Sequence, residues 1–385
     1  MATIRKRGDS YQIRVSCGYD AKGKQVVRTK TWKPDKGLTA KQTEKELNKQ
    51  AVLFEQACMN GYLTSTMKFS DFMERWLKEY AEKQLKLTTL DTMGQKISRI
   101  NEEIGHLRLD KINRRTIQDL IQSLLNGNSK HRPLCAKTVK NYVSFVSSIL
   151  NYAISLDMLS VNPCSKANIP PIKRAQREMY TLEEAQLFID TLIKKAPLLY
   201  QCYFILMIYS GFRRGEMCGL TWNDVDFENH IITINKALYH ITEKGATLDT
   251  PKTATSNRSL RIADEVFTYL KRLKEHYEQE KLRLGTKWED NDFVFKRDDG
   301  RVISPLTPNE WLHRFCEHEN LKYVVPHSFR HLNASLLIDS GASVKTVQAC
   351  LGHSDASTTL NIYAHAFSKA QAKASEAVAS NFKLV

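Results

Sequence analysis

The spacing of apolar residues changes twice along this chain of 385 residues, and that change constrains the fold more than any other feature. Apolar and polar side chains first alternate on both sides of a glycine-containing turn, which predicts a β-hairpin joined by a short strand. A helix then follows, ended by Gly61. These patterns predict a small N-terminal domain, residues 1–64, with strands at 3–7, 11–16 and 25–32, a turn at 20–23 and a helix over 39–60.

Apolar residues next recur every three or four positions, as they do on the buried face of a helix. An all-α domain is therefore predicted over residues 68–165, with further helices at 89–104, 116–125 and 137–155. Prolines between 162 and 171 indicate a linker to the next domain. The first helix of the all-α domain carries four aromatic residues that are expected in its core: Phe69, Phe72, Trp76 and Tyr80.

The last section, residues 176–385, combines both patterns. Thr181 and Glu184 have the spacing of a capping box, and Gly211 is placed to end a fully apolar helix over 200–209. The section is thus predicted to be mainly α-helical with a small antiparallel sheet, and the whole chain to be a multidomain α+β protein. Strand-like runs are found at 230–237 and 258–262, and helical spacing resumes after 264.

A formal net charge of +15 favours a polyanionic partner over an acidic small molecule. On the predicted N-terminal sheet the positive charge indicates either a solvated face or a sheet that enters a DNA groove. In the all-α domain basic residues lie between helices or at helix starts, where cations oppose the helix dipole but suit phosphate contacts. The DNA-binding candidates are Arg5, Arg7, Arg14, Arg28, Lys30, Arg114, Arg115, Arg132, Lys137 and Lys140.

Other partners and cofactors have weaker support. Eight cysteines are scattered singly, which argues against a zinc or redox site and predicts reduced thiols. The N-terminal residues lack an apolar stretch, and no segment has the roughly 18 continuous apolar residues of a membrane-spanning helix. A cytoplasmic protein without metal, cofactor or membrane contact is expected.

Four short segments of the last section carry residues that are suited to catalysis. Two of them contain pairs three residues apart, which lie on one face when the segment is helical. A third is a polar turn between the two strand-like runs. The candidates are Arg213 and Glu216 in Gly-Phe-Arg-Arg-Gly-Glu, Lys252 in Thr-Pro-Lys-Thr, His327 and Arg330 in Pro-His-Ser-Phe-Arg-His, and His353 and Tyr363 in the segment that begins Leu-Gly-His-Ser.

Each candidate alone has an ordinary interpretation, such as an exposed ion pair, a solvated lysine or a packed tyrosine. His327 and His331 have zinc-ligand spacing, but the glutamate of HExxH and a third ligand are absent. Together the residues fit cleavage of a phosphodiester without metal. Two guanidinium groups can hold the non-bridging oxygens, a phenol can attack, and a lysine can protonate the leaving 5′-oxygen.

The order and amino-acid sequences of these segments resemble the signature boxes of the tyrosine recombinase (phage integrase) family, and the three-domain layout is similar as well. The arrangement is most similar to integrases of conjugative transposons and prophages of Gram-positive bacteria. The resemblance implies an arm-site DNA-binding domain, a helical core-binding (SAM-like) domain and a catalytic domain. Leu332 and Asn333 stand where many relatives have threonine, outside the implied catalytic set.

Carried onto the matching positions, the resemblance implies that Arg213 and Arg330 hold the scissile phosphate and that Tyr363 forms a 3′-phosphotyrosine. Lys252 would be the general acid for the 5′-oxygen, and Glu216 would order the site. His327 would be a general base or a phosphate ligand, and His353 would donate a hydrogen bond to the phosphate. No cofactor is implied.

Strand exchange through a four-way junction further implies a homotetramer on two molecules of double-stranded DNA that carry core and arm sites. The resemblance also leaves open an accessory directionality factor. The tail, residues 364–385, has a helical pattern and either packs on its own domain or docks on a neighbouring protomer. Two other functions stay open. A strand-passage enzyme of the type IB topoisomerase kind would relax supercoils without sequence dependence, and a non-catalytic DNA-binding regulator would form no covalent adduct.

Overall fold

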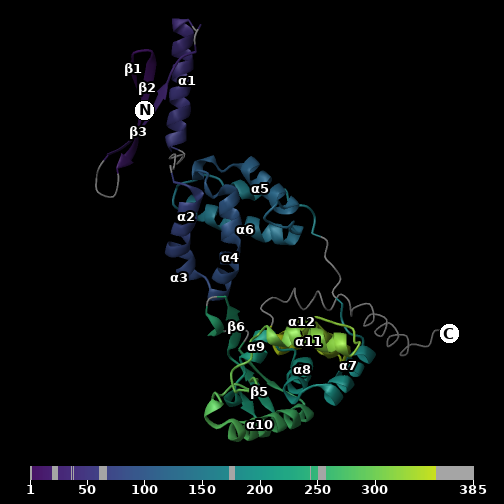
Figure 1. Ribbon diagram of the computed structural model, residues 1–385. Helices are drawn as coiled ribbons and strands as arrows, with labels where there is room; N and C mark the ends of the chain where they lie inside the picture. The colour runs from purple at the N-terminus through teal and green to yellow at the C-terminus, as the bar shows by residue number, and fades with distance from the viewer. Residues whose placement is uncertain are drawn as a thin grey trace, which may run out of the picture. The chain divides into compact units, whose positions relative to one another are not determined.

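The computed structural model of the chain describes residues 2–19, 25–35, 37, 39–59, 67–172, 178–242, 244–249 and 257–352. Two compact units are formed by residues 1–174 and 175–385 (Figure 1). The first contains a three-stranded sheet with one helix, followed by a purely helical part, and the second is mainly helical with two small antiparallel sheets. The predicted multidomain α+β fold is confirmed.

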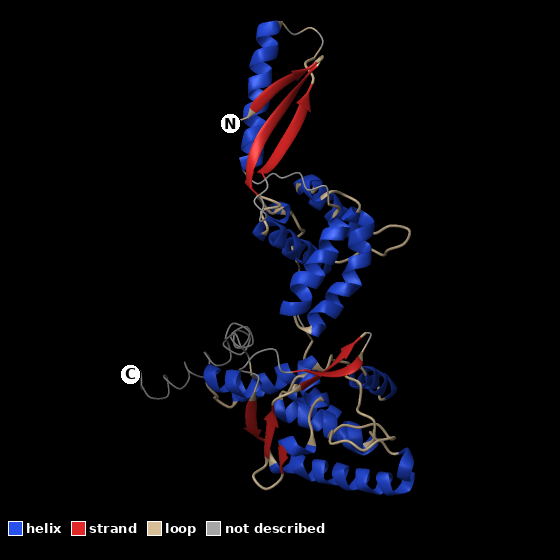
Figure 2. Ribbon diagram, turned by 90° about the vertical axis from the view of Figure 1, so that its left-hand side faces the viewer, coloured by secondary structure: helices blue, strands red, loops and turns tan. Residues whose placement is uncertain are grey.

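The N-terminal sheet has the order β1-β2-β3 and is antiparallel throughout. One helix, α1, packs along it (Figure 2) and covers Ile13, which is fully buried with Leu47 and Ala51. Alternation along the strands therefore divides the sheet into a face that α1 covers and an open face. The elements are β1 (Thr3–Arg7), β2 (Ser10–Tyr19), β3 (Gln25–Trp32) and α1 (Ala40–Met59).

The basic residues of this sheet lie on both faces. Lys30 pairs with Ile13 across the strands, and its Nζ donates a hydrogen bond to Gln50 of α1 at 3.0 Å. Arg28 pairs with Val15, so it also faces the helix side. The other face is open, and it carries the even-numbered residues of β2, which alternate with the buried Ile13 and Val15. Three arginines lie on this open face, one in β2 and two paired with its even-numbered residues: Arg14, Arg5 and Arg7.

The helical part of the first unit buries an apolar core around Phe69, Phe72 and Trp76, as predicted. Tyr80 was expected there too, but 41% of it is exposed. The reason is a π-helical turn at Leu77–Ala81, which inserts residues into the helical repeat and rotates the following positions away from the core. The helices are α2 (Phe69–Trp76), α3 (Glu82–Gln84), α4 (Leu87–Ile100), α5 (Arg114–Asn126) and α6 (Ala136–Ser155).

The loop between α5 and α6 is held by a buried arginine. Arg99, 6% exposed, donates hydrogen bonds to the carbonyls of Arg132 and Ser123. His131 lies 3.0 Å from the carboxylate of Glu102, which fastens the same loop to the π-helical turn Asn101–Gly105 that follows α4. Arg132 itself projects into solvent from a loop whose backbone is fixed.

The core of the second unit surrounds α8, whose residues 202–208 are all buried. A helix that is apolar on every side is expected at the centre of a fold. Aromatic rings of Phe188, Phe204 and Phe329 pack against one another beside it. The helices are α7 (Leu182–Lys195), α8 (Leu198–Ser210), α9 (Arg214–Cys218), α10 (Asp264–Leu284), α11 (Thr307–His318), α12 (His327–Asp339) and α13 (Val344–Leu351).

The strands of this unit form one sheet of order β4-β5-β8 and a separate hairpin of β6 and β7. The prediction of one strand over 230–237 is wrong. Asn235 and Lys236 both contact Asp224, at 3.0 and 2.7 Å, and these contacts end β5 and redirect the chain into the β6–β7 hairpin. The polar segment with Lys252 therefore follows a strand of this hairpin. The strands are β4 (Val225–Asp226), β5 (Ile231–Ile234), β6 (Ala237–Ile241), β7 (Gly245–Asp249) and β8 (Arg258–Arg261).

Two glycines end the helices that lead to the site. Gly211 follows α8 with φ of 64°, and Gly352 follows α13 with φ of 63°, both in the left-handed region that favours glycine. A Cβ on Gly211 would lie 2.6 Å from Leu351 and 2.8 Å from Asn333, so the two helix ends pack closely. Asn333 also donates hydrogen bonds to the carbonyls of Ile208 and Tyr209, which caps α8 from the neighbouring helix.

Candidate active site

Arg213 and Glu216 begin α9 directly after the Gly211 turn. The carboxylate of Glu216 accepts hydrogen bonds from the backbone N–H of Arg213 at 2.9 Å and from its Nη1 at 2.7 Å. Glu216 is only 2% exposed, whereas the Arg213 side chain is 36% exposed. The pair is thus a buried carboxylate that orients a partly accessible guanidinium, and not the exposed ion pair of the ordinary interpretation.

Arg330 reaches the same place from α12. Its side chain is buried, and its Nη1 donates a hydrogen bond to the carbonyl of Gly211 at 2.7 Å. The neighbouring Phe329 is buried in the core, as the sequence predicts, and this fixes the rotation of α12. Gly211, Arg213 and Arg330 are therefore brought together from two helices that are more than a hundred residues apart in the chain.

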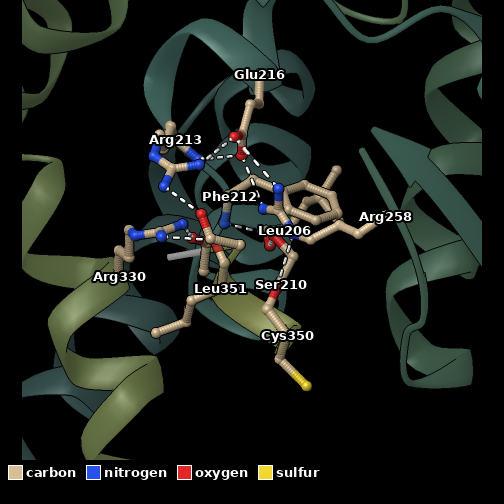
Figure 3. A network of polar contacts seen from close by, with 11 residues as sticks. Leu206, Ser210, Phe212, Arg213, Glu216, Arg258, Arg330, Cys350 and Leu351 are labelled. Carbon is tan, nitrogen blue, oxygen red and sulfur yellow. Dashed lines mark hydrogen bonds and ion pairs between the residues drawn. The ribbon is translucent and has the colours of Figure 1, made fainter. Parts of the chain in front are cut away.

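The last turn of α13 joins this cluster through three consecutive carbonyl groups (Figure 3). The carbonyl of Cys350 accepts from Nε of Arg258 at 2.8 Å, that of Leu351 from Nη2 of Arg330 at 2.5 Å, and that of Gly352 from Nη2 of Arg213 at 2.6 Å. The final carbonyls of a helix lack partners within the helix and carry its negative dipole end. Three guanidinium groups thus cap one helix terminus.

Arg258 is a member of the cluster that the sequence analysis missed. Its Nη2 lies 2.8 Å from Oε2 of Glu216, and its side chain is 6% exposed. Strand periodicity held a usable signal, because Arg258 shares the parity of Leu260 and Ile262 and so faces the interior side of β8. An arginine on the apolar side of a strand requires a buried anion, and Glu216 supplies it.

The charges of the cluster do not balance. The cluster contains three guanidinium groups and one carboxylate, which pairs with two of them, so an excess of about two positive charges is left. Burial and the charge of Arg213 lower the pKa of Arg330 to about 9, although Glu216 opposes the shift. Burial would raise the pKa of Glu216, but the hydrogen bond and charge of Arg258 and the charge of Arg213 outweigh it and lower the pKa. An anion bound here would remove the imbalance.

The other predicted catalytic residues are described in part. His327 is the exposed first residue of α12, and its ring centroid lies 4.9 Å from that of His331. Lys252, His353 and Tyr363 lie outside the described residues. Within the described ranges no group of three metal-ligating side chains is found, and no helix there is long and apolar enough to cross a membrane.

The DNA-binding candidates of the helical part are all exposed. Arg114 and Arg115 stand in the first turn of α5, and Lys137 and Lys140 near the start of α6, with Arg132 in the loop before it. Their exposure and shared position at two helix starts suit phosphate contacts. Whether these residues touch DNA stays a prediction, as it does for those of the N-terminal sheet.

Fold and site define a protein with several domains and a largely buried cluster of arginines in its C-terminal unit. The profile described as "Phage integrase family" matches residues 178–370, and "Phage integrase, N-terminal SAM-like domain" matches residues 68–125. The chain therefore belongs to the phage integrase family of tyrosine site-specific recombinases, which are enzymes that cleave and rejoin DNA.

Two relatives agree with this assignment, and a solved structure shares the fold. A tyrosine recombinase XerC-like protein of Caldanaerobacter subterraneus is 27% identical over 97% of this chain and 96% of its own. The ICEBs1 integrase of Bacillus subtilis is 28% identical over 68% of this chain and 69% of its own. Among solved structures, the Tn1549 transposon integrase in complex with transposon right end DNA covers 81% of this chain and 100% of its own, with a TM-score of 0.69 and 21% identity.

Proposed function

We propose that Arg213 and Arg330 bind the scissile phosphate of DNA and that Tyr363 is the nucleophile that attacks it. The observation that carries this proposal is the unbalanced charge. Glu216 pairs with Arg213 and Arg258, and Arg330 joins them through a carbonyl at the end of α13, so the cluster keeps an excess positive charge that an anion can neutralise. A phosphodiester supplies one negative charge at rest and a second as the pentavalent transition state forms, so binding strengthens during the reaction.

The reaction needs no cofactor under this proposal. The Tyr363 oxygen forms a bond to phosphorus while the bond from phosphorus to the 5′-oxygen breaks, and Lys252 gives the leaving oxygen its proton. His327 either takes the phenolic proton or binds the phosphate, and His353 donates a hydrogen bond to it. Because the 3′-phosphotyrosine conserves the energy of the broken bond, a 5′-hydroxyl of another strand can reverse the attack and join the new partner.

The first unit holds the DNA in this proposal. Arg5, Arg7 and Arg14 share the open face of the N-terminal sheet, which makes that face the one that would enter a groove at arm sites. Arg28 and Lys30 face α1 on the other side of the sheet, so they would add positive charge beside this surface. At core sites the starts of α5 and α6 would contact phosphates through Arg114, Arg115, Arg132, Lys137 and Lys140.

The proposed oligomeric state is a homotetramer, because each chain carries one nucleophile and two duplexes have four strands to exchange. Under this proposal the tail, residues 364–385, docks on a neighbouring protomer and couples cleavage to assembly, and an accessory factor could set the direction. Deleting the residues after Ser368 is expected to abolish tetramers on DNA and strand exchange while binding by single protomers persists. Native electrophoresis and a strand-exchange assay measure both, and unchanged exchange would contradict the docking proposal.

The nucleophile can be tested before the target sequence is known. The full-length protein is incubated with nicked duplexes whose core is randomised, and covalent adducts are isolated under denaturing conditions. Sequencing then identifies the DNA, and mass spectrometry identifies the modified residue. We expect a phosphotyrosine at Tyr363, loss of the adduct in Tyr363→Phe with DNA binding retained, and normal adduct in Tyr323→Phe, which removes the hydroxyl of an exposed tyrosine in the same unit.

The same experiment separates the other two functions. A wild-type protein that binds DNA but gives no adduct on any nicked duplex would be a regulator. An enzyme of the type IB topoisomerase kind would give adducts without a common sequence and would relax supercoiled plasmids as a single protomer. Recombination requires adducts with a shared sequence and the joining of strands from two duplexes.

A further inference from the structure

Arg258 joins Glu216 of α9 to the last turn of α13, alongside Arg213, which contacts Glu216 and the carbonyl of Gly352. One side of its guanidinium contacts Glu216 through Nη1 at 3.3 Å and Nη2 at 2.8 Å. Its Nε donates to the carbonyl of Cys350, in the last turn of α13, at 2.8 Å. The same side chain lies over the ring of Phe212, 5.2 Å from its centroid. It therefore touches the start of α9 and the end of α13 at once.

The backbone of Arg258 is itself fixed. It pairs with Ile234 as the first residue of β8, and the register continues along both strands to Ile231 and Arg261. A residue in a paired strand has little freedom, so its side chain can transmit the position of the sheet to a helix end. The planar guanidinium is suited to this, since its five N–H groups point in fixed directions and can serve two acceptors.

Gly352 leaves room for this contact. A Cβ on Gly352 would lie 2.9 Å from Nη1 of Arg258, closer than real Cβ atoms come, and 3.3 Å from its Cδ, which is a tight contact. The left-handed φ of 63° also disfavours any residue with a side chain. Glycine is therefore needed twice at this position, for its backbone angle and for the approach of Arg258.

We propose that Arg258 is a positioning residue for DNA cleavage. It would hold the carboxyl end of α13 against the start of α9, so that the chain after Gly352, which contains His353 and Tyr363 in sequence, begins at a fixed place beside Arg213 and Arg330. The inference rests on the proposed function. A narrower role is the rival, in which Arg258 only neutralises Glu216 and any cation would serve.

Lysine separates the two roles. In Arg258→Lys an ammonium can pair with Glu216, but one nitrogen at the end of a flexible stem cannot also serve Cys350 in the same geometry. Arg258→Met removes both contacts. Matched controls are Arg261→Lys and Arg261→Met, because Arg261 lies on the same strand but is 68% exposed and pairs with the exposed Asp264.

The experiment uses the full-length chain and the nicked duplex selected above. It measures the dissociation constant for DNA, the single-turnover rate of adduct formation at saturating protein, and hydrogen exchange of the amides at 344–353. We expect Arg258→Lys to bind DNA within about twofold of wild type but to form adduct about 10²-fold more slowly, as for a misplaced catalytic group. Amides at the end of α13 should exchange faster in this variant and unchanged in both Arg261 controls.

The possible results are distinguishable. Adduct formation by Arg258→Lys at the wild-type rate would show that charge alone matters and would overturn the proposal, as would slow cleavage with unchanged exchange at α13. If Arg258→Met does not fold, Arg258→Lys still decides. A wild-type protein without adduct would instead refute the proposed function.

Discussion

Replacing Arg330 with methionine is expected to slow covalent DNA cleavage by about 10³-fold or more and to leave the folded protein nearly as stable as wild type. The activity is lost because methionine cannot donate hydrogen bonds to the phosphate or offset the charge of its transition state. A single preorganised donor or arginine in such a site has effects of this size. The single-turnover rate on the selected nicked duplex measures the loss.

The expected stability follows from two opposing effects. The folded environment lowers the pKa of Arg330 to about 9, so the buried cation is held at a cost on the order of 5 kcal/mol, and methionine, which replaces only the aliphatic stem, relieves it. Against this, the carbonyls of Gly211 and Leu351 each lose a donor, at about 1–3 kcal/mol apiece. The two effects offset each other to within a few kcal/mol.

Arg314→Met is the matched control, since it removes an exposed arginine from α11 of the same unit. This control should cleave DNA at the wild-type rate. Thermal unfolding of Arg330→Met with a midpoint far below that of wild type would show that Arg330 is mainly structural. Cleavage within tenfold of wild type would remove Arg330 from the phosphate site.

The sequence predicted the elements of the fold where one hydrophobic period persists. Helix α8 is one example, because it is apolar on every side, and strand β2 is another, because apolar and polar residues alternate over 11–16. The period failed at Tyr80, where a π-helical turn shifts the repeat, and at β5, where contacts from Asn235 and Lys236 to Asp224 interrupt an apolar run. Both failures have local structural causes that the spacing of apolar residues does not reveal.

Three residues of the arginine cluster were predicted from the sequence, but its geometry was not. Local sequence motifs named Arg213, Glu216 and Arg330, and these three do meet in the structure. Nothing in those motifs indicates that the end of α13 provides the carbonyls that hold the guanidinium groups. Arg258 carries no motif at all, and its partner Glu216 lies 42 positions away, so only the folded chain reveals the contact.

Replacing Glu216 with glutamine is expected to lower the free energy of unfolding by about 3–5 kcal/mol at pH 7, the cost of removing one partner of a buried ion pair. For a unit of this size the midpoint of thermal unfolding should fall by about 10 °C. The loss arises because Arg213, Arg258 and Arg330 would then share a buried site without any carboxylate. Glu317→Gln is the control, since that side chain is 76% exposed, and it should unfold like wild type.

The pH dependence of this difference has a definite sign. The pKa of Glu216 is lower in the folded protein than its ordinary value, so its stabilising contribution is complete above about pH 4.5 and is lost as the pH falls through the folded pKa. Urea unfolding at neutral and at acidic pH should therefore show a large gap between wild type and Glu216→Gln that narrows in acid. A gap that stays constant with pH would mean that the lost stability does not come from the charge of Glu216.

An added anion gives the last check on the charge balance of the cluster. If three guanidinium groups without a carboxylate destabilise Glu216→Gln, inorganic phosphate should bind the folded variant and raise its unfolding midpoint more than that of wild type. The variant Glu216→Gln/Arg330→Met, with one cation fewer, should respond less. Equal responses of wild type and both variants to phosphate would mean that the anion binds elsewhere on this basic protein. The proposal that Arg213 and Arg330 bind the scissile phosphate would then be refuted.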